Sequence, residues 1–214
     1  MTSARVDRHL HRLSTPRAAA LAGVLFALLF GTALVLIRIA LPEGTAPGTQ
    51  WVAAEGYRIR IASVLLPFAG IAFLWFIGVV RDGFGGFEDK FFSSVFIGSG
   101  LLFLAMIFTA SAVGVAVTHT SGDVAEFGRV MLLTLSKTYA LRMAAVFMIS
   151  LATIWLKTDL MPRWLVGLTY LVAVGLLLSS DLTMWLVLAF PIWVLVVSVL
   201  LLMRAGVLDL ERHD

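Results

Sequence analysis

Apolar residues run through this chain in long blocks, separated by short clusters of charge, glycine and proline. Six blocks have about the 20 residues that a helix needs to cross a hydrocarbon core of roughly 30 Å. All six are predicted to be helices, because a spanning segment must satisfy its own backbone hydrogen bonds. The predicted spans are Ala18–Ala40, Ile61–Val80, Ser93–Val117, Lys137–Leu156, Trp164–Ser180 and Leu182–Met203.

The composition places the chain among membrane proteins. Hydrophobic residues make up 60% of it and charged residues 14%, whereas about a quarter of a soluble globular chain is charged. We therefore expect an all-α, polytopic transmembrane bundle over residues 18–203. A basic segment, residues 1–17, precedes the bundle and a short tail, residues 204–214, follows it.

The basic residues indicate the orientation of the bundle. An even number of spans places both termini on one side, and by this assignment ten Lys and Arg fall on that side against six on the other. The positive-inside rule then predicts cytoplasmic termini. Because the charges are scattered around helix ends and form no basic domain, a nucleic-acid partner is not expected. The ten are Arg5, Arg8, Arg12, Arg17, Arg81, Lys90, Lys157, Arg163, Arg204 and Arg212.

Residues 123–156 are too long for one crossing, because a helix of that length measures roughly 50 Å. Asp123 followed by Glu126 has the spacing of a capping box, and Gly128 offers a break. We therefore predict a short amphipathic helix on the outer surface at about residues 123–135. The fourth span follows it from near Lys137.

A polar site inside the membrane is suggested by charges in or beside the apolar blocks. Arg142 and Lys137 lie in the fourth block, Arg38 ends the first, and Asp181 lies between the last two. In one interpretation Arg142 points into the bundle and meets Asp181 or a bound anion, on a ligand or ion path. In the other, the cations anchor helix ends at the outer boundary and Asp181 caps the sixth span.

Three further arginines, Arg58, Arg60 and Arg129, are predicted on the outer side. They could form a basic collar for phosphate headgroups or for a soluble anion. Acidic residues on the same side could instead neutralise them. Both interpretations stay open at this stage.

Prolines and small residues indicate how the helices pack. Pro67 and Pro191 each remove a backbone donor inside a predicted span, so a kink is expected at each. A stripe of small residues along the third span predicts close packing between helices, within one protomer or between protomers. The stripe consists of Ser94, Gly98, Ala105, Thr109, Ala112 and Ala116.

Several kinds of chemistry are not expected. The chain has no cysteine, and His9, His11, His119 and His213 lie outside the spans or at their ends. Haem or zinc ligation within the membrane is therefore not predicted, and neither a metal site, a cofactor nor a catalytic residue is proposed. The chain is not expected to be an enzyme.

Four segments resemble a group of small actinobacterial multi-pass membrane proteins to which no activity is assigned. They are RAAALAGVLFALLF, PFAGIAFLWFIGVVRDGFGGFEDKFF, MPRWLVGLTY and FPIWVLVVSVLLLMR. The resemblance covers most of the chain and contains no catalytic motif. It implies a bacterial inner (plasma) membrane and supplies no substrate or site residue.

Two functions remain in view. The first is permeation or binding of a small solute, ion or lipid headgroup, as in a channel or transporter. The second is a non-catalytic accessory or scaffold subunit, with the phenylalanine-rich loop of residues 84–92 and the small-residue stripe as docking surfaces. The expected partners are membrane lipids and either further copies of the chain or the members of a membrane complex. A water-filled path to Arg142 would favour the first function, and a solid core the second.

Overall fold

The computed structural model describes the backbone of residues 3–41, 51–83, 90–179 and 184–210, with side chains for residues 20–41, 56–83, 90–178 and 186–203. Within these ranges nearly every residue is helical, which confirms the all-α prediction. The α-helices are α1 (Ser3–Ala40), α2 (Trp51–Asp82), α3 (Lys90–Val117), α4 (Gly122–Leu133), α5 (Ala140–Thr158), α6 (Arg163–Ser179) and α7 (Ala189–Leu210). A π-helical turn, η2 (Thr134–Tyr139), joins α4 to α5, and a 3-10 turn, η3 (Met184–Leu188), precedes α7.

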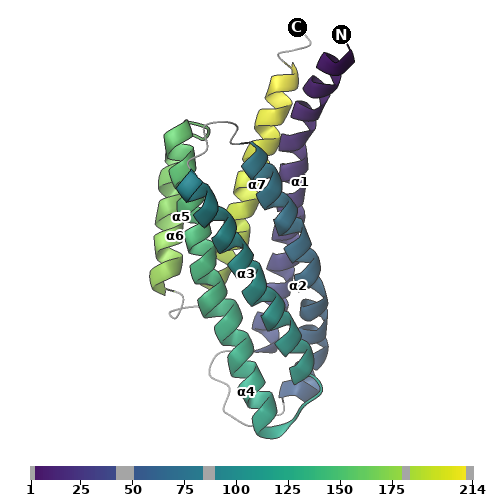
Figure 1. Ribbon diagram of the computed structural model, residues 1–214. Coiled ribbons are helices and arrows are strands. Elements are labelled where there is room, and N and C mark those ends of the chain that lie inside the picture. The colour runs from purple at the N-terminus through teal and green to yellow at the C-terminus, as the bar shows by residue number, and fades with distance from the viewer. Residues whose placement is uncertain (1–2, 42–50, 84–89, 180–183, 211–214) are drawn as a thin grey trace.

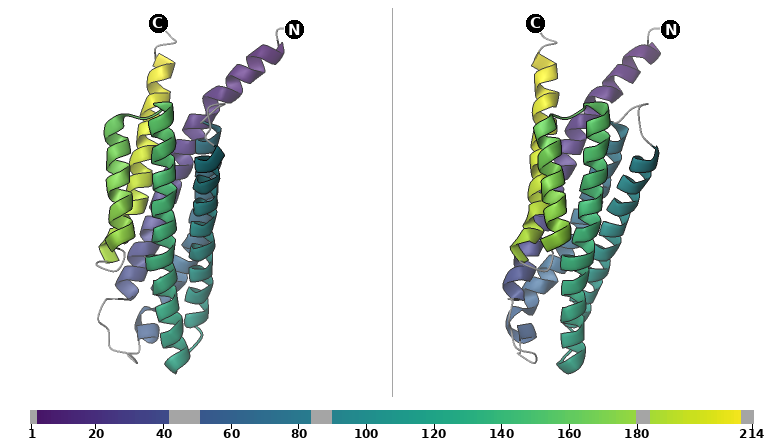
Figure 2. Two further views of the ribbon diagram at one scale, coloured as in Figure 1. Left: turned by 60° about the vertical axis from the view of Figure 1, so that its left-hand side comes forward. Right: turned by 90° about the vertical axis from the view of Figure 1, so that its left-hand side faces the viewer.

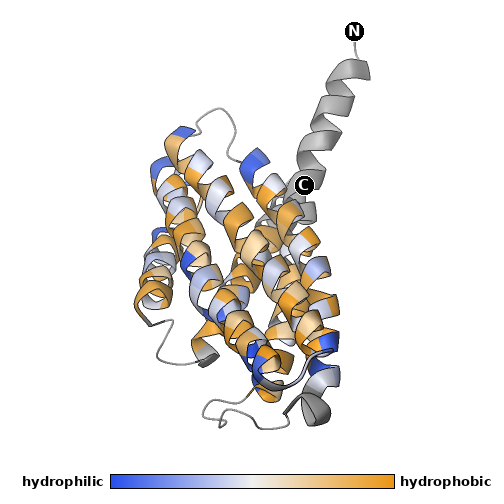
Figure 3. Cartoon of the chain, turned by 60° about the horizontal axis from the view of Figure 1, so that its bottom comes forward, coloured by the Kyte–Doolittle hydropathy of each residue, from blue (hydrophilic) through white to orange (hydrophobic). Residues whose placement is uncertain are grey.

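Five helical stretches are long and apolar enough to cross a membrane: Ala20–Ala40, Gly56–Asp82, Lys90–Val117, Gly122–Thr158 and Leu186–Met203. The remaining predicted span corresponds to α6, which has 17 residues and therefore measures about 25 Å. That is shorter than a typical hydrocarbon core. Figure 3 shows that hydrophobic positions cover most of the helices and that hydrophilic positions gather mostly toward helix ends.

The helices form an elongated bundle in which the start of α1 and the end of α7 lie at the same end (Figure 1). Helix α1 packs mainly against α2 and α7, α3 packs against α2 and α5, and α6 packs against α5. We call the end that holds the start of α1 the near end, and the opposite end, where α1 finishes and α4 begins, the far end. Which side of a membrane each end faces stays a prediction.

The stretch from Gly122 to Thr158 runs as one long helical column (Figure 2). Three details differ from the prediction. The N-cap residue is Ser121, not Asp123, and Glu126 binds Arg129 instead of closing a capping box. Gly128 does not break the helix: it is buried, and a methyl group there would overlap the side chain of Val117, so it allows α4 to approach α3 closely.

Phenylalanine rings from five helices fill the centre of the bundle. Phe73 of α2 lies 4.7 Å from Phe26 of α1 and 5.2 Å from Phe103 of α3, measured between ring centroids. Phe147 of α5 is 5.1 Å from Phe73, and Phe190 of α7 is 5.0 Å from Phe103. All five rings are almost completely buried. Their edge-to-face and tilted contacts make this part of the interior a solid aromatic core.

Pro67 lies inside α2 without ending it. A proline cannot donate to the carbonyl four residues earlier, which here belongs to Ser63. The hydroxyl of Ser111 on α3 donates to this carbonyl at 2.7 Å, so the neighbouring helix replaces the lost bond. The backbone bond that Pro67 cannot make is therefore compensated by α3, although Pro67 itself is exposed.

Pro191 lies within the apolar stretch Leu186–Met203, close to a change of helix geometry. The 3-10 turn η3 ends at Leu188 and the regular helix begins at Ala189. Pro191 therefore lies in the first turn of α7, where a missing backbone donor costs little, and the kink expected there stays a prediction.

Candidate functional site

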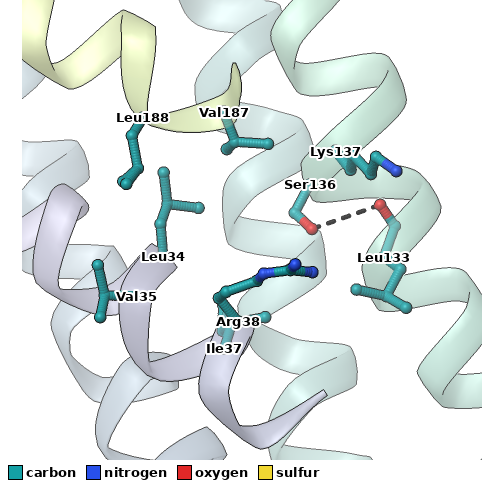
Figure 4. A pocket seen from close by; sticks show the side chains of 9 residues that line it. All are labelled: Leu34, Val35, Ile37, Arg38, Leu133, Ser136, Lys137, Val187 and Leu188. Carbon is teal, nitrogen blue, oxygen red and sulfur yellow. Dashed lines mark hydrogen bonds between the residues drawn. The ribbon is translucent and has the colours of Figure 1, made fainter. Parts of the chain in front are cut away.

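A narrow crevice opens toward the far end of the bundle, where α1, the long helical column and η3 meet (Figure 4). The crevice has a volume of about 410 Å³ when the space at its open mouth is included. The part that water-sized molecules can occupy is about 30 Å³. That inner volume is room for about two waters. The crevice is lined by Leu34, Val35, Ile37, Arg38, Leu133, Ser136, Lys137, Val187 and Leu188.

Three of the lining side chains are polar. The guanidinium of Arg38 extends from α1 toward Ser136 and Leu133 (Figure 4). Lys137 also lines the crevice, but in this view its ammonium points away from Arg38. Both cations are half-buried, and Ser136 is 5% exposed. The Ser136 hydroxyl donates to the carbonyl of Leu132 at 2.7 Å. Two cationic side chains and one hydroxyl therefore share a lining that is otherwise apolar.

The two cations come from segments about a hundred residues apart in sequence, and the fold brings them to one place. Arg38 lies in the last turn of α1, and Lys137 lies in the π-helical turn. The long stem of Lys137 is flexible, so its ammonium can reach an anion at the mouth of the crevice. Sequence reasoning named both residues and missed Ser136, for which the neighbouring Lys137 in an apolar block was the only signal.

Two departures from regular α-helix border the crevice. Ser136 and Lys137 belong to the π-helical turn η2, and Val187 and Leu188 belong to the 3-10 turn η3. A π-helical turn inside a longer helix often marks a functional position, whereas a 3-10 turn is common at the start of a helix. The crevice thus coincides with the place where two helices depart from regular geometry.

Arg142 and Asp181 were predicted to meet. Arg142 lies in the first turn of α5, is half-buried and does not line the crevice. Asp181 lies outside the described residues, so their pairing stays a prediction.

The predicted basic collar is not assembled as one site. Arg129 is bound to Glu126, with 2.6 Å between Nη2 and Oε1, which agrees with the alternative that acids neutralise the outer cations. Arg58 and Arg60 were expected to precede the second span, but they lie within α2. The guanidinium of Arg58 lies 5.2 Å from the ring centroid of its neighbour Tyr57. None of the three arginines lines the crevice.

A larger groove lies between α1 and α2, nearer the near end, and offers about 620 Å³ to water-sized molecules, against about 30 Å³ in the crevice. Its lining contains only apolar residues, namely Leu21, Ala22, Leu25, Leu29, Phe68, Ile71, Ala72 and Trp75. Ligand sites combine apolar walls with a few convergent polar groups. Despite its smaller volume, the crevice is therefore the better candidate site.

Among the residues that the structure describes, no group of three or more His, Cys, Asp or Glu is placed to hold a metal ion. The chain matches no known protein family, no curated protein and no solved structure.

Proposed function

We propose that this protein is a membrane-embedded binding protein that holds a phosphate-bearing anion at the mouth of the crevice. The observation that carries the proposal is the placement of Arg38 and Lys137, from two separate helical segments, on one narrow and otherwise mostly apolar crevice. A guanidinium binds phosphate through two parallel hydrogen bonds, and an ammonium adds a point charge. Basic pockets between transmembrane helices are a recurrent way to bind lipid headgroups.

The apolar walls favour a lipid as the source of the phosphate. Leu34, Val35 and Leu188 border the same crevice as Arg38. A phospholipid carries its charged group next to hydrocarbon, so both parts find matching surroundings. A free phosphate ion would leave these walls without a matching partner, because hydrated anions gain nothing from apolar surface.

Binding is favoured over permeation because the rings of Phe26, Phe73, Phe103, Phe147 and Phe190 occupy the middle of the bundle. Ions would need a hydrated path along the bundle, and close-packed rings leave no room for one. We therefore expect vesicles containing the protein to pass ions and anions no faster than protein-free vesicles. The same result is expected for Arg142→Ala. Flux that depends on the protein would contradict this part of the proposal.

The binding test is thermal unfolding of the purified protein in detergent, with a short-chain phosphatidylglycerol, a short-chain phosphatidylcholine or inorganic phosphate added. A ligand at about 100 times its Kd stabilises the folded state by about 2.7 kcal/mol, which raises Tm by roughly 5 to 10 °C for a chain of this size. We expect this rise with phosphatidylglycerol and its loss in Arg38→Gln.

The matched control is Arg60→Gln, because Arg60 is exposed on α2 and lines neither cavity. This variant should keep the full rise in Tm. An equal rise with inorganic phosphate alone would assign the site to a soluble anion. A rise that survives in Arg38→Gln would place the binding elsewhere and would overturn the proposal.

A second candidate function is that of a non-catalytic accessory subunit, supported by the small-residue stripe on α3. Ser94, Ala105, Thr109, Ala112 and Ala116 are exposed, and open space surrounds Gly98. This face is therefore turned away from the protomer's own core and is suited to another helix. Native mass spectrometry tests it: Ala105→Trp should convert an oligomer to monomers, and a protein that is already monomeric would exclude self-association.

A further inference from the structure

The buried face of the long helical column changes its spacing at the π-helical turn. Leu132, Ser136, Ala140 and Ala144 are all buried and follow one another at intervals of four residues. A regular α-helix has 3.6 residues per turn, so three intervals of four accumulate about one residue too many. The wide turn Thr134–Tyr139 absorbs that residue and keeps both α4 and α5 facing the bundle.

The same turn changes the backbone hydrogen bonds beside the crevice. The amide of Ala140 donates to the carbonyl of Leu135, five residues back. In an α-helix it would bond the carbonyl of Ser136. The bonding pattern is therefore altered at Ser136, one of the three polar residues of the crevice.

Packing alone does not explain the extra residue. If one residue of the turn were removed, Leu132, Ser136, Ala140 and Ala144 would follow at intervals averaging close to 3.6, and a regular α-helix could link the same buried faces. Irregular helical turns are less favourable than regular ones, and they persist where a site needs the geometry they provide.

We propose that the wide turn Thr134–Tyr139 is a site-building element: the fold does not require it, but the anion site does, because the turn presents Ser136 and Lys137 to the crevice opposite Arg38. This inference rests on the proposed anion binding. By this inference, binding depends on the orientation of Ser136 and Lys137 as well as on their identity.

The test is deletion of Tyr139, an exposed residue at the end of the turn. The deletion leaves Ser136, Lys137 and Arg38 in the chain but allows a regular helix from α4 to α5. We expect the variant to fold, with a Tm close to that of the wild type, and its apparent affinity for short-chain phosphatidylglycerol to fall at least tenfold. The matched control is Tyr139→Ala, which removes the side chain, keeps the turn and should bind as the wild type does.

Deletion of Thr134, at the other end of the turn, provides an independent second variant. If both deletion variants fail to fold, the turn is required by the fold and the inference is wrong. If they fold and bind phosphatidylglycerol normally, the inference is also wrong, but the proposed function stands as long as Arg38→Gln abolishes binding. If the wild type itself does not bind, the proposed function fails first.

Discussion

The centre and the far half of this bundle are built differently. In the centre, phenylalanines from five α-helices pack against one another. In the far half, the helices depart from regular α-helical geometry at Thr134–Tyr139 and at Met184–Leu188. There too the Ser111 hydroxyl donates to the Ser63 carbonyl, which Pro67 leaves without its usual donor.

The difference shows how each kind of interior accommodates a helix backbone. A regular helix satisfies the hydrogen bonds of all its internal backbone groups. Apolar rings can therefore surround it without leaving a backbone group unpaired. An irregular turn releases backbone groups that need other partners, and polar side chains must be close by to supply them. The far half therefore collects both the irregular turns and the polar crevice.

The largest loss of unfolding free energy is expected from a substitution in the aromatic core. Phe73 contacts rings from four other helices, so Phe73→Ala should leave a cavity and lower the free energy of unfolding by about 3 kcal/mol. Phe68→Ala on the same helix is the control, because Phe68 is 58% exposed. Thermal unfolding in detergent measures both. Equal losses in the two variants would mean that the rings do not form the stabilising core.

A smaller effect is expected where α1 and α7 approach closely in the near half. A methyl group on Gly23 would overlap the hydroxyl of Ser198 and come within 2.9 Å of the Phe76 ring. Gly23→Ala should therefore lower the free energy of unfolding by about 1 to 3 kcal/mol, and Ser198→Ala in the same chain should restore part of it. Gly31→Ala, on the same helix with open space around it, should be neutral or slightly stabilising. Similar Tm values for Gly23→Ala and Gly31→Ala would show that the two helices do not meet this closely.

The smallest effect concerns the far half and requires a double-mutant cycle. Ser111→Ala removes the donor to the Ser63 carbonyl and should cost about 1 kcal/mol of unfolding free energy. In a Pro67→Ala background, residue 67 regains an amide that can bond this carbonyl, so the same change should cost less. Unfolding in detergent of the four proteins gives the coupling. Strictly additive effects would show that Ser111 does not compensate for Pro67.

The helical architecture and the apolar blocks could be predicted from the sequence. The length of an apolar block and the need to satisfy its backbone hydrogen bonds depend only on residues within that block. The predicted spans overlap the described helices, but their ends differ: α2 begins at Trp51 and not near Ile61, and the fourth helical stretch runs on from Gly122. The sixth becomes regular only at Ala189, and α6 is shorter than a full crossing. Arg38 and Lys137 could be named as candidate site residues because charge in an apolar block is visible in the sequence. Which charges meet could not be predicted, since that depends on how helices distant in sequence are packed.

Tertiary structure alone decided three features. The small-residue stripe faces outward, whereas other small residues of α3, Ser99, Gly100 and Gly114 among them, are buried in the bundle. In a sequence, both sets predict close helix packing equally well. The wide turn at Thr134–Tyr139 is seen only in the folded chain, because neighbouring helices select which positions of α4 and α5 are buried on either side of it. The sequence by itself determined that the chain forms apolar helices with cations in or near their end turns. The contacts between those helices determined that Arg38 and Lys137 share one crevice, because side-chain direction around a helix becomes fixed only when its buried face is chosen.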